Sequence, residues 1–143
     1  MSDRAPLLEA KRLVKRFGGV SALRDVDVSL FPGETLGMIG PNGSGKTTFV
    51  NAVTGHLRVD AGSVHLAGTE TTRLQPYQLA KIGLTRTYQA VRVFGGLDVR
   101  RNLGTARLLH REGGGMTDEA LRELLAWLRL DHALDRDAGS LTL

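Results

Sequence analysis

Residues 40–48 have the sequence Gly-Pro-Asn-Gly-Ser-Gly-Lys-Thr-Thr, and this stretch decides the fold. Its first eight residues match the pattern G-x-x-x-x-G-K-[ST] at every fixed position. The glycines let the backbone turn tightly around phosphate oxygens, where a Cβ atom would collide. Successive backbone N–H groups then form an anion-binding concavity at the start of the following helix. The stretch therefore predicts a phosphate loop that binds a nucleotide, without specifying the class of enzyme.

Two side chains of this phosphate loop (residues 40–48) carry most of its expected chemistry. Lys46 supplies a positive charge to the β- and γ-phosphates, and Thr47 supplies a hydroxyl ligand to Mg²⁺. The alternative is a glycine-rich turn that happens to contain a lysine. Such a match is expected by chance in on the order of one chain in a hundred or fewer. The position of the stretch, between an apolar segment and a helical one, also favours phosphate binding.

The segments around the loop predict strands. Residues 7–17 mix apolar and basic residues, which favours an edge strand, and residues 26–30 alternate strictly, which favours a half-buried strand. Residues 34–39, ETLGMI, are mostly apolar and predict a buried strand that leads into the phosphate loop. Residues 62–67 and 82–87 predict two more strands.

Helices are expected after the loop and in the last third of the chain. Helical spacing of apolar residues follows the phosphate loop up to Gly55, and residues 75–80 and 99–109 predict two more helices. Thr117 is the expected N-cap of a further helix. That helix carries a leucine stripe that we expect to pack in the core: Leu121, Leu124, Leu125 and Leu128.

The composition is typical of a soluble globular chain, with 143 residues, 41% hydrophobic and 24% charged. The absence of cysteine excludes disulfides, zinc fingers, iron–sulfur clusters and a cysteine nucleophile. No stretch approaches the roughly 18 apolar residues that a membrane span requires. The net charge of +4 raises the question of a nucleic-acid partner. The basic residues are scattered and aromatics make up only 5%, which argues against nucleic acid.

The order of features resembles the ATP-binding subunit of an ATP-binding-cassette (ABC) transporter. The matching features ahead of the phosphate loop are residues 15–19 (KRFGG), 22–23 (AL), 26–30 (VDVSL) and 33–34 (GE). Residues 85–103, TRTYQAVRVFGGLDVRRNL, narrow the resemblance to the branched-chain amino acid importers. Their glutamine loop has the pattern T-R-T-[FY]-Q, followed by x-x-R-x-F and x-x-N-L. Many other cassettes have a proline before that glutamine, where this chain has Tyr88.

The resemblance implies an α/β fold of the P-loop NTPase class, ABC-cassette type, and incomplete. Its parts would be an N-terminal β-subdomain, the phosphate-loop strand and helix, and the start of a helical subdomain. Residues 1–92 would form the nucleotide-binding core, with the phosphate loop and the glutamine loop. Residues 93–143 would form a partial helical subdomain.

The resemblance also implies ATP and Mg²⁺ as cofactors and a role for each site residue. Phe17 corresponds to the aromatic residue that stacks on adenine; the alternative is a core phenylalanine at a strand end. Gln89 corresponds to the glutamine that reaches Mg²⁺ and the attacking water. Lys46 and Gln89 are thus the expected catalytic residues, and Thr47 and Gln89 the expected metal ligands. The expected phosphate cradle contains Gly40, Asn42, Gly43, Ser44, Gly45, Lys46, Thr47 and Thr48.

Partners and location follow from the same resemblance. The glutamine loop and the helical subdomain would contact membrane-spanning permease subunits. A second ATP-binding subunit would complete a head-to-tail dimer in the complete protein. The expected location is cytoplasmic, peripheral on the inner face of the cell membrane, where ATP hydrolysis would drive import of branched-chain amino acids, urea or short amides.

The family pattern continues after a pair such as Ser140-Leu141 with a signature loop, an apolar strand ending in Asp-Glu, and a switch histidine. None of these occurs in the 143 residues, which therefore look like the N-terminal part of such a subunit. Residues 124–132, LLAWLRLDH, do not replace the Asp-Glu strand, because their leucines have helical spacing. This leaves ATPase activity open. One alternative is a non-catalytic nucleotide-binding or docking fragment. Another, a small-molecule kinase, explains neither Phe17 nor residues 85–103.

Overall fold

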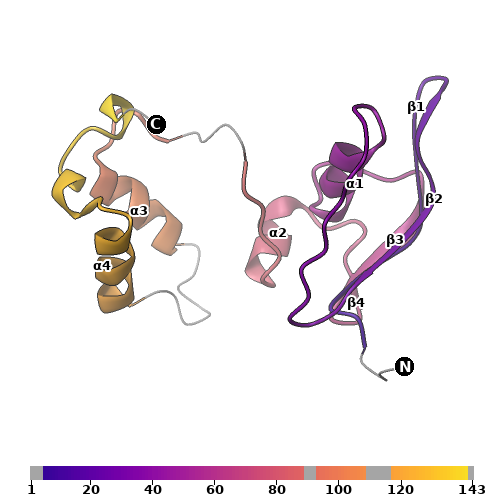
Figure 1. Ribbon diagram of the computed structural model, residues 1–143, viewed down its shortest axis with the longest axis horizontal. Coiled ribbons are helices and arrows are strands. Elements are labelled where there is room, and N and C mark those ends of the chain that lie inside the picture. The colour runs from indigo at the N-terminus through magenta and orange to yellow at the C-terminus, as the bar shows by residue number, and fades with distance from the viewer. Residues whose placement is uncertain (1–4, 89–92, 109–116, 142–143) are drawn as a thin grey trace. The chain divides into compact units, whose positions relative to one another are not determined.

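The computed structural model describes residues 5–88, 93–108 and 117–141 (Figure 1). The chain divides into two compact units, Met1–Arg86 and Thr87–Leu143. The first unit contains a β-sheet and two helices, and the second is helical. None of the helices in the described ranges is both long enough and apolar enough to span a membrane.

The sheet of the first unit has four antiparallel strands in the order β2-β1-β3-β4. Their bounds are Leu8–Phe17 (β1), Val20–Leu30 (β2), Ala61–Leu66 (β3) and Thr69–Glu70 (β4). The prediction that residues 7–17 form an edge strand is wrong, because β1 pairs with β2 on one side and with β3 on the other. Although β1 is a central strand, its Lys11, Arg12 and Arg16 are exposed.

Helix α1, Lys46–Val53, follows the phosphate loop and covers the sheet (Figure 1). Its Phe49, Ala52 and Val53 are buried. They pack against the buried strand residues Ala10, Leu13, Leu23 and Val64. The helix ends at the C-cap Thr54, and Gly55, the glycine expected to end the helix, follows it with a left-handed φ of 73°. The buried helix face and the apolar sheet residues therefore make one small core.

Two predicted strands are not formed. Residues 31–40 are fully in the exposed class, and Ile39 keeps 98% of its surface in solvent. Residues 82–87 also have no strand, although the short helix before them, α2 (Pro76–Lys81), forms as predicted. A strand needs a hydrogen-bonded neighbour for its backbone. The four strands pair with one another, and no described segment pairs with residues 34–39. The predicted phosphate-loop strand is therefore wrong for this structure.

The second unit contains α3, Val99–Leu108, and α4, Asp118–Trp127, followed by short 3-10 turns at Asp131–Ala133 and Ala138–Ser140. The predicted N-cap is confirmed, because Thr117 Oγ1 accepts a hydrogen bond from the Ala120 backbone N–H at 3.1 Å. The leucine stripe is only partly in the core. Leu125 is buried, whereas Leu124 and Leu128 are exposed.

Candidate functional site

The phosphate loop closes around the side chain of Lys46. The Lys46 Nζ donates hydrogen bonds to the carbonyl oxygens of Gly40 at 2.7 Å and Pro41 at 2.8 Å. Its third contact is Ser44 Oγ at 3.3 Å. An ammonium group has three donors, so all three are directed at oxygens of the loop. The positive charge predicted to meet a nucleotide's phosphates is thus held inside the curve of the loop, at the start of α1.

Gly45 shows why this position takes glycine. It is the N-cap of α1 and lies in the left-handed region, with φ 93° and ψ 0°. A Cβ atom built there would lie 2.5 Å from the backbone oxygen of Ala22. The collision expected from sequence was with a phosphate, but the obstacle found is strand β2. Glycine is therefore needed both for the turn and for the close packing of the loop on the sheet.

The electrostatics around the loop favour an anion. Residues 35–59 contain no Asp or Glu, while Lys46 lies within them. The first backbone N–H groups of a helix have no partner within the helix and carry a partial positive charge. Thr47 is exposed and Thr48 is half-buried in this first turn. Asn42, Gly43 and Ser44 are also exposed. The predicted cradle residues thus lie at or near the surface, beside the positively charged Lys46 and the N-terminus of α1.

Phe17 lies at the end of the hairpin that touches the loop. Gly45 packs against Ala22, and two residues before Ala22 in β2, Val20 pairs with Phe17. Phe17 thus ends the hairpin whose second strand contacts the phosphate loop. Phe17 is 49% exposed. It is therefore not the buried core phenylalanine that was its alternative.

A polar cluster beside Phe17 was missed by sequence reasoning. Lys15 Nζ lies 5.5 Å from the centroid of the Phe17 ring and 2.8 Å from Asp60 Oδ1. The other carboxylate oxygen, Asp60 Oδ2, accepts the Arg16 backbone N–H at 2.7 Å. The hydrogen bond from Lys15, and then the one from Arg16, hold the pKa of Asp60 below its ordinary value. No sequence pattern joins Asp60 to residues more than forty positions earlier.

The predicted glutamine, Gln89, lies outside the described residues. The segment before it contacts the phosphate-loop helix, because Arg86 Nη1 donates a hydrogen bond to Asn51 Oδ1. Asn51 lies four residues after Thr47, one turn further along α1. Arg86 of the T-R-T-Y-Q stretch is thus connected to the helix that carries Lys46 and Thr47.

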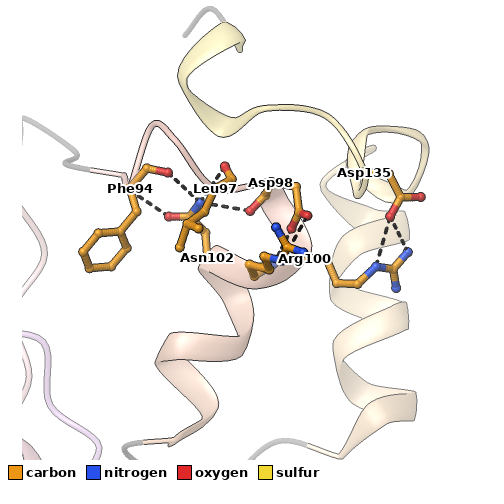
Figure 2. Close-up of polar contacts among 7 residues, drawn as sticks. Phe94, Leu97, Asp98, Arg100, Asn102 and Asp135 are labelled. Carbon is orange, nitrogen blue, oxygen red and sulfur yellow. Dashed lines mark hydrogen bonds and ion pairs between the residues drawn. The ribbon is translucent and has the colours of Figure 1, made fainter.

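Asn102, the asparagine of the x-x-N-L pattern, makes several hydrogen bonds to backbone groups of the second unit. Figure 2 shows the Asn102 side chain pointing to the residues just before α3. Its Oδ1 accepts the Phe94 backbone N–H at 2.8 Å, and its Nδ2 donates to the carbonyl oxygens of Phe94 and Leu97. Arg100 forms an ion pair with Asp135 at 3.0 Å across the same unit (Figure 2). Sequence alone marked Asn102 only as part of a family pattern.

A glycine-rich loop that closes around a lysine at the start of a helix, packed on a β-sheet, defines the class of P-loop NTPases. A family model described as "ABC transporter" matches residues 23–142. The chain therefore belongs to the ABC transporter family. This confirms the resemblance drawn from the sequence and the predicted fold class.

Two similar proteins are named as branched-chain amino acid transport ATP-binding proteins. The chain is 34% identical over 149 residues to the probable branched-chain amino acid transport ATP-binding protein LivG of Archaeoglobus fulgidus, covering 95% of this chain and 58% of that protein. It is 35% identical over 152 residues to the high-affinity branched-chain amino acid transport ATP-binding protein LivG of Escherichia coli K12, covering 95% of this chain and 59% of that protein.

A solved structure supports the same fold. The ADP conformation of an ATP-binding cassette of an ABC transporter matches with a TM-score of 0.73 and 30% identity, over 96% of this chain and 59% of that one. That relative binds a nucleotide, as its description states. The chain thus spans 58% to 59% of the length of these relatives.

Proposed function

We propose that this chain is the ATP-binding component of an ABC transporter that imports branched-chain amino acids, with ATP hydrolysis driving transport in the complete protein. The observation that carries the proposal is the Lys46 ammonium held in the loop by Gly40, Pro41 and Ser44 at the start of α1. The names of the LivG relatives support the amino acid substrates.

Within this proposal each site residue has a separate task. Lys46 binds the β- and γ-phosphates, and Phe17 stacks on the adenine. Thr47, exposed in the first turn of α1, and Gln89 bind Mg²⁺. The donor set fits, since hydroxyl and amide oxygens are ligands that this hard cation accepts. Bound there, Mg²⁺ would neutralise charge on the phosphates.

The proposed partners are permease subunits and a second ATP-binding subunit. Residues 93–143 and the glutamine loop would contact the permease, and the two ATP-binding subunits would form a head-to-tail dimer. The proposed location is therefore the cytoplasmic side of the membrane, peripheral on its inner face. The proposed functional division into residues 1–92 and 93–143 assigns nucleotide binding to the first part and permease contact to the second.

A second function, nucleotide binding without turnover, is favoured by one observation. Residues 35–59 around the loop carry no carboxylate, so this stretch supplies no group to polarise an attacking water. The chain would then bind ATP and dock on another protein through its helical part, with no ATPase activity of its own.

Equilibrium binding and turnover separate the two functions. We expect the purified chain to bind ATP in the presence of Mg²⁺. We expect the Lys46→Ala variant to lose most or all of this affinity. Lys11→Ala is the matched control, because Lys11 is an exposed lysine of β1 paired with Glu9. Steady Mg²⁺-dependent hydrolysis that Lys46→Ala abolishes supports a catalytic chain. Binding without hydrolysis supports the second function only if the complete protein also binds ATP without hydrolysing it, and absence of ATP binding contradicts both.

The transported substrate is tested in the assembled transporter. With the permease in vesicles, branched-chain amino acids should stimulate ATP hydrolysis, whereas urea and short amides should not. Stimulation by urea or amides alone would contradict the proposed substrate class and leave the nucleotide site unaffected.

A further inference from the structure

At the end of strand β1, the ammonium group of Lys15 lies over the aromatic ring of Phe17. Lys15 Nζ lies over the Phe17 ring at 5.5 Å from its centroid. Asp60, just before β3, binds the same Nζ at 2.8 Å and the backbone N–H of Arg16 at 2.7 Å. The Asp60 backbone N–H in turn donates to the Val14 carbonyl at 2.8 Å. Asp60 therefore contacts three consecutive residues of β1, Val14 to Arg16, directly before Phe17.

The two charged partners, Lys15 and Asp60, differ in how far their side chains are buried. The Lys15 side chain is only 14% exposed, whereas that of Asp60 is 43% exposed. A lysine side chain normally moves among many rotamers, and ordering it is costly. Here the ion pair and the ring restrain the same ammonium, whose distance falls within the roughly 6 Å at which a cation attracts an aromatic face. The ring is thereby restrained as well.

Phe17 still offers surface to a ligand. Although Lys15 lies over its ring, the residue is 49% exposed. An exposed aromatic ring stacks on a planar base, and it does so more effectively when its orientation is set in advance.

We propose that Asp60 is a positioning residue for the nucleotide base: it holds Lys15 over the Phe17 ring and fixes the Arg16 backbone, so that Phe17 presents its remaining surface to the base. This inference rests on the proposed function, in which Phe17 stacks on adenine. It adds that base affinity depends on two charged residues that lie outside the phosphate loop.

The test compares ATP with inorganic triphosphate, which has the phosphates but no base. Removing an aromatic platform costs about 5- to 150-fold in affinity, and loosening it costs part of that. We expect Asp60→Asn to weaken ATP binding by the full chain about three- to tenfold and to leave triphosphate affinity unchanged. The asparagine oxygen still accepts the Arg16 N–H, so this variant isolates the contact with Lys15.

Two further variants sharpen the test. Lys15→Met keeps an apolar side chain over the ring and loses the charge, so it should match Asp60→Asn. Asp27→Asn is the matched control, because Asp27 Oδ1 accepts the Arg12 backbone N–H at 2.8 Å on the same hairpin, away from Phe17. It should change neither affinity. In a Phe17→Ala background, Asp60→Asn should have no further effect on ATP binding.

Two results would overturn the inference alone. One is unchanged ATP affinity in both Asp60→Asn and Lys15→Met. The other is an equal loss of ATP and triphosphate affinity, which indicates a general structural role. Failure of the unchanged chain to bind either ligand would instead refute the proposed function, and this inference with it.

Discussion

Gly45→Ala should destabilise the first unit more than the same change elsewhere in the phosphate loop. The new Cβ would lie 2.5 Å from the Ala22 backbone oxygen and 3.4 Å from Leu23 Cδ2. The first contact involves backbone of strand β2, so neither partner can move aside by a change of rotamer. The residue would also have to keep a φ of 93°.

The two costs can be estimated separately. A left-handed conformation costs a residue with a Cβ atom about 1–2 kcal/mol. Forcing an extra methyl group into a closely packed position costs about 1–3 kcal/mol more. Gly45→Ala should therefore lower the free energy of unfolding by about 2–5 kcal/mol. This is a large fraction of the roughly 5–15 kcal/mol that stabilises a typical domain.

Two other glycines provide matched controls. Gly43 has a φ of 82° but nothing within 4 Å of an added Cβ atom, so Gly43→Ala should cost only the conformational part, about 1–2 kcal/mol. Gly19 has open space and no left-handed φ, so Gly19→Ala should change stability by less than about 1 kcal/mol.

Urea unfolding of the ligand-free chain, followed by far-UV circular dichroism, measures all three variants. The expected order of destabilisation is Gly45→Ala, then Gly43→Ala, then Gly19→Ala. An effect at Gly45 equal to or smaller than that at Gly43 would refute the packing of the loop on Ala22.

Three further predictions concern single contacts. Thr117→Ala should destabilise the second unit by about 1 kcal/mol through loss of the N-cap of α4, and Thr117→Ser should not; amide hydrogen exchange of residues in α4 measures this, and equal effects would contradict the cap. Asn102→Ala should cost about 1–3 kcal/mol by the same measurement on α3, because backbone groups of residues 94–98 lose their partner, and a change below 0.5 kcal/mol would contradict this. The pKa of Asp60 is depressed, so its stabilising contribution is fully present above its ordinary value of 3.8 and is lost as the pH falls through the lower folded-state pKa. The difference in urea midpoint between the unchanged chain and Asp60→Asn should therefore stay constant from about pH 7 to about pH 5 and shrink below about pH 4; a constant difference down to about pH 2 would contradict it.

Local features of this protein were predictable from sequence. The phosphate loop, the helix after it, the cap at Thr117 and the short helix at Pro76 all form where the residues indicated. Each depends on contacts between residues that are close in sequence, such as Lys46 with Gly40 or Thr117 with Ala120. Contacts of this kind can be predicted directly from the order of the residues.

Strand predictions failed where a partner was required. Residues 34–39 have the apolar composition of a buried strand, yet they are exposed and no described strand pairs with them. Residues 7–17 have the mixed composition of an edge strand, yet β1 is central because β3 pairs with it. Composition gives the tendency of a segment to be a strand, but the hydrogen-bonded neighbour decides whether and where it forms.

The sequence by itself determined the family to which the chain belongs and predicted the chemistry of the phosphate loop. Only the tertiary structure decided that Gly45 lies against Ala22 and that Asp60 holds Lys15 over the ring of Phe17. It also decided that Leu125 is buried while Leu124, its neighbour on the same helix, is exposed. These contacts join residues that are distant in sequence, or they depend on which face of a helix is covered. Their energy is set by the packing of whole helices and strands rather than by the local order of residues.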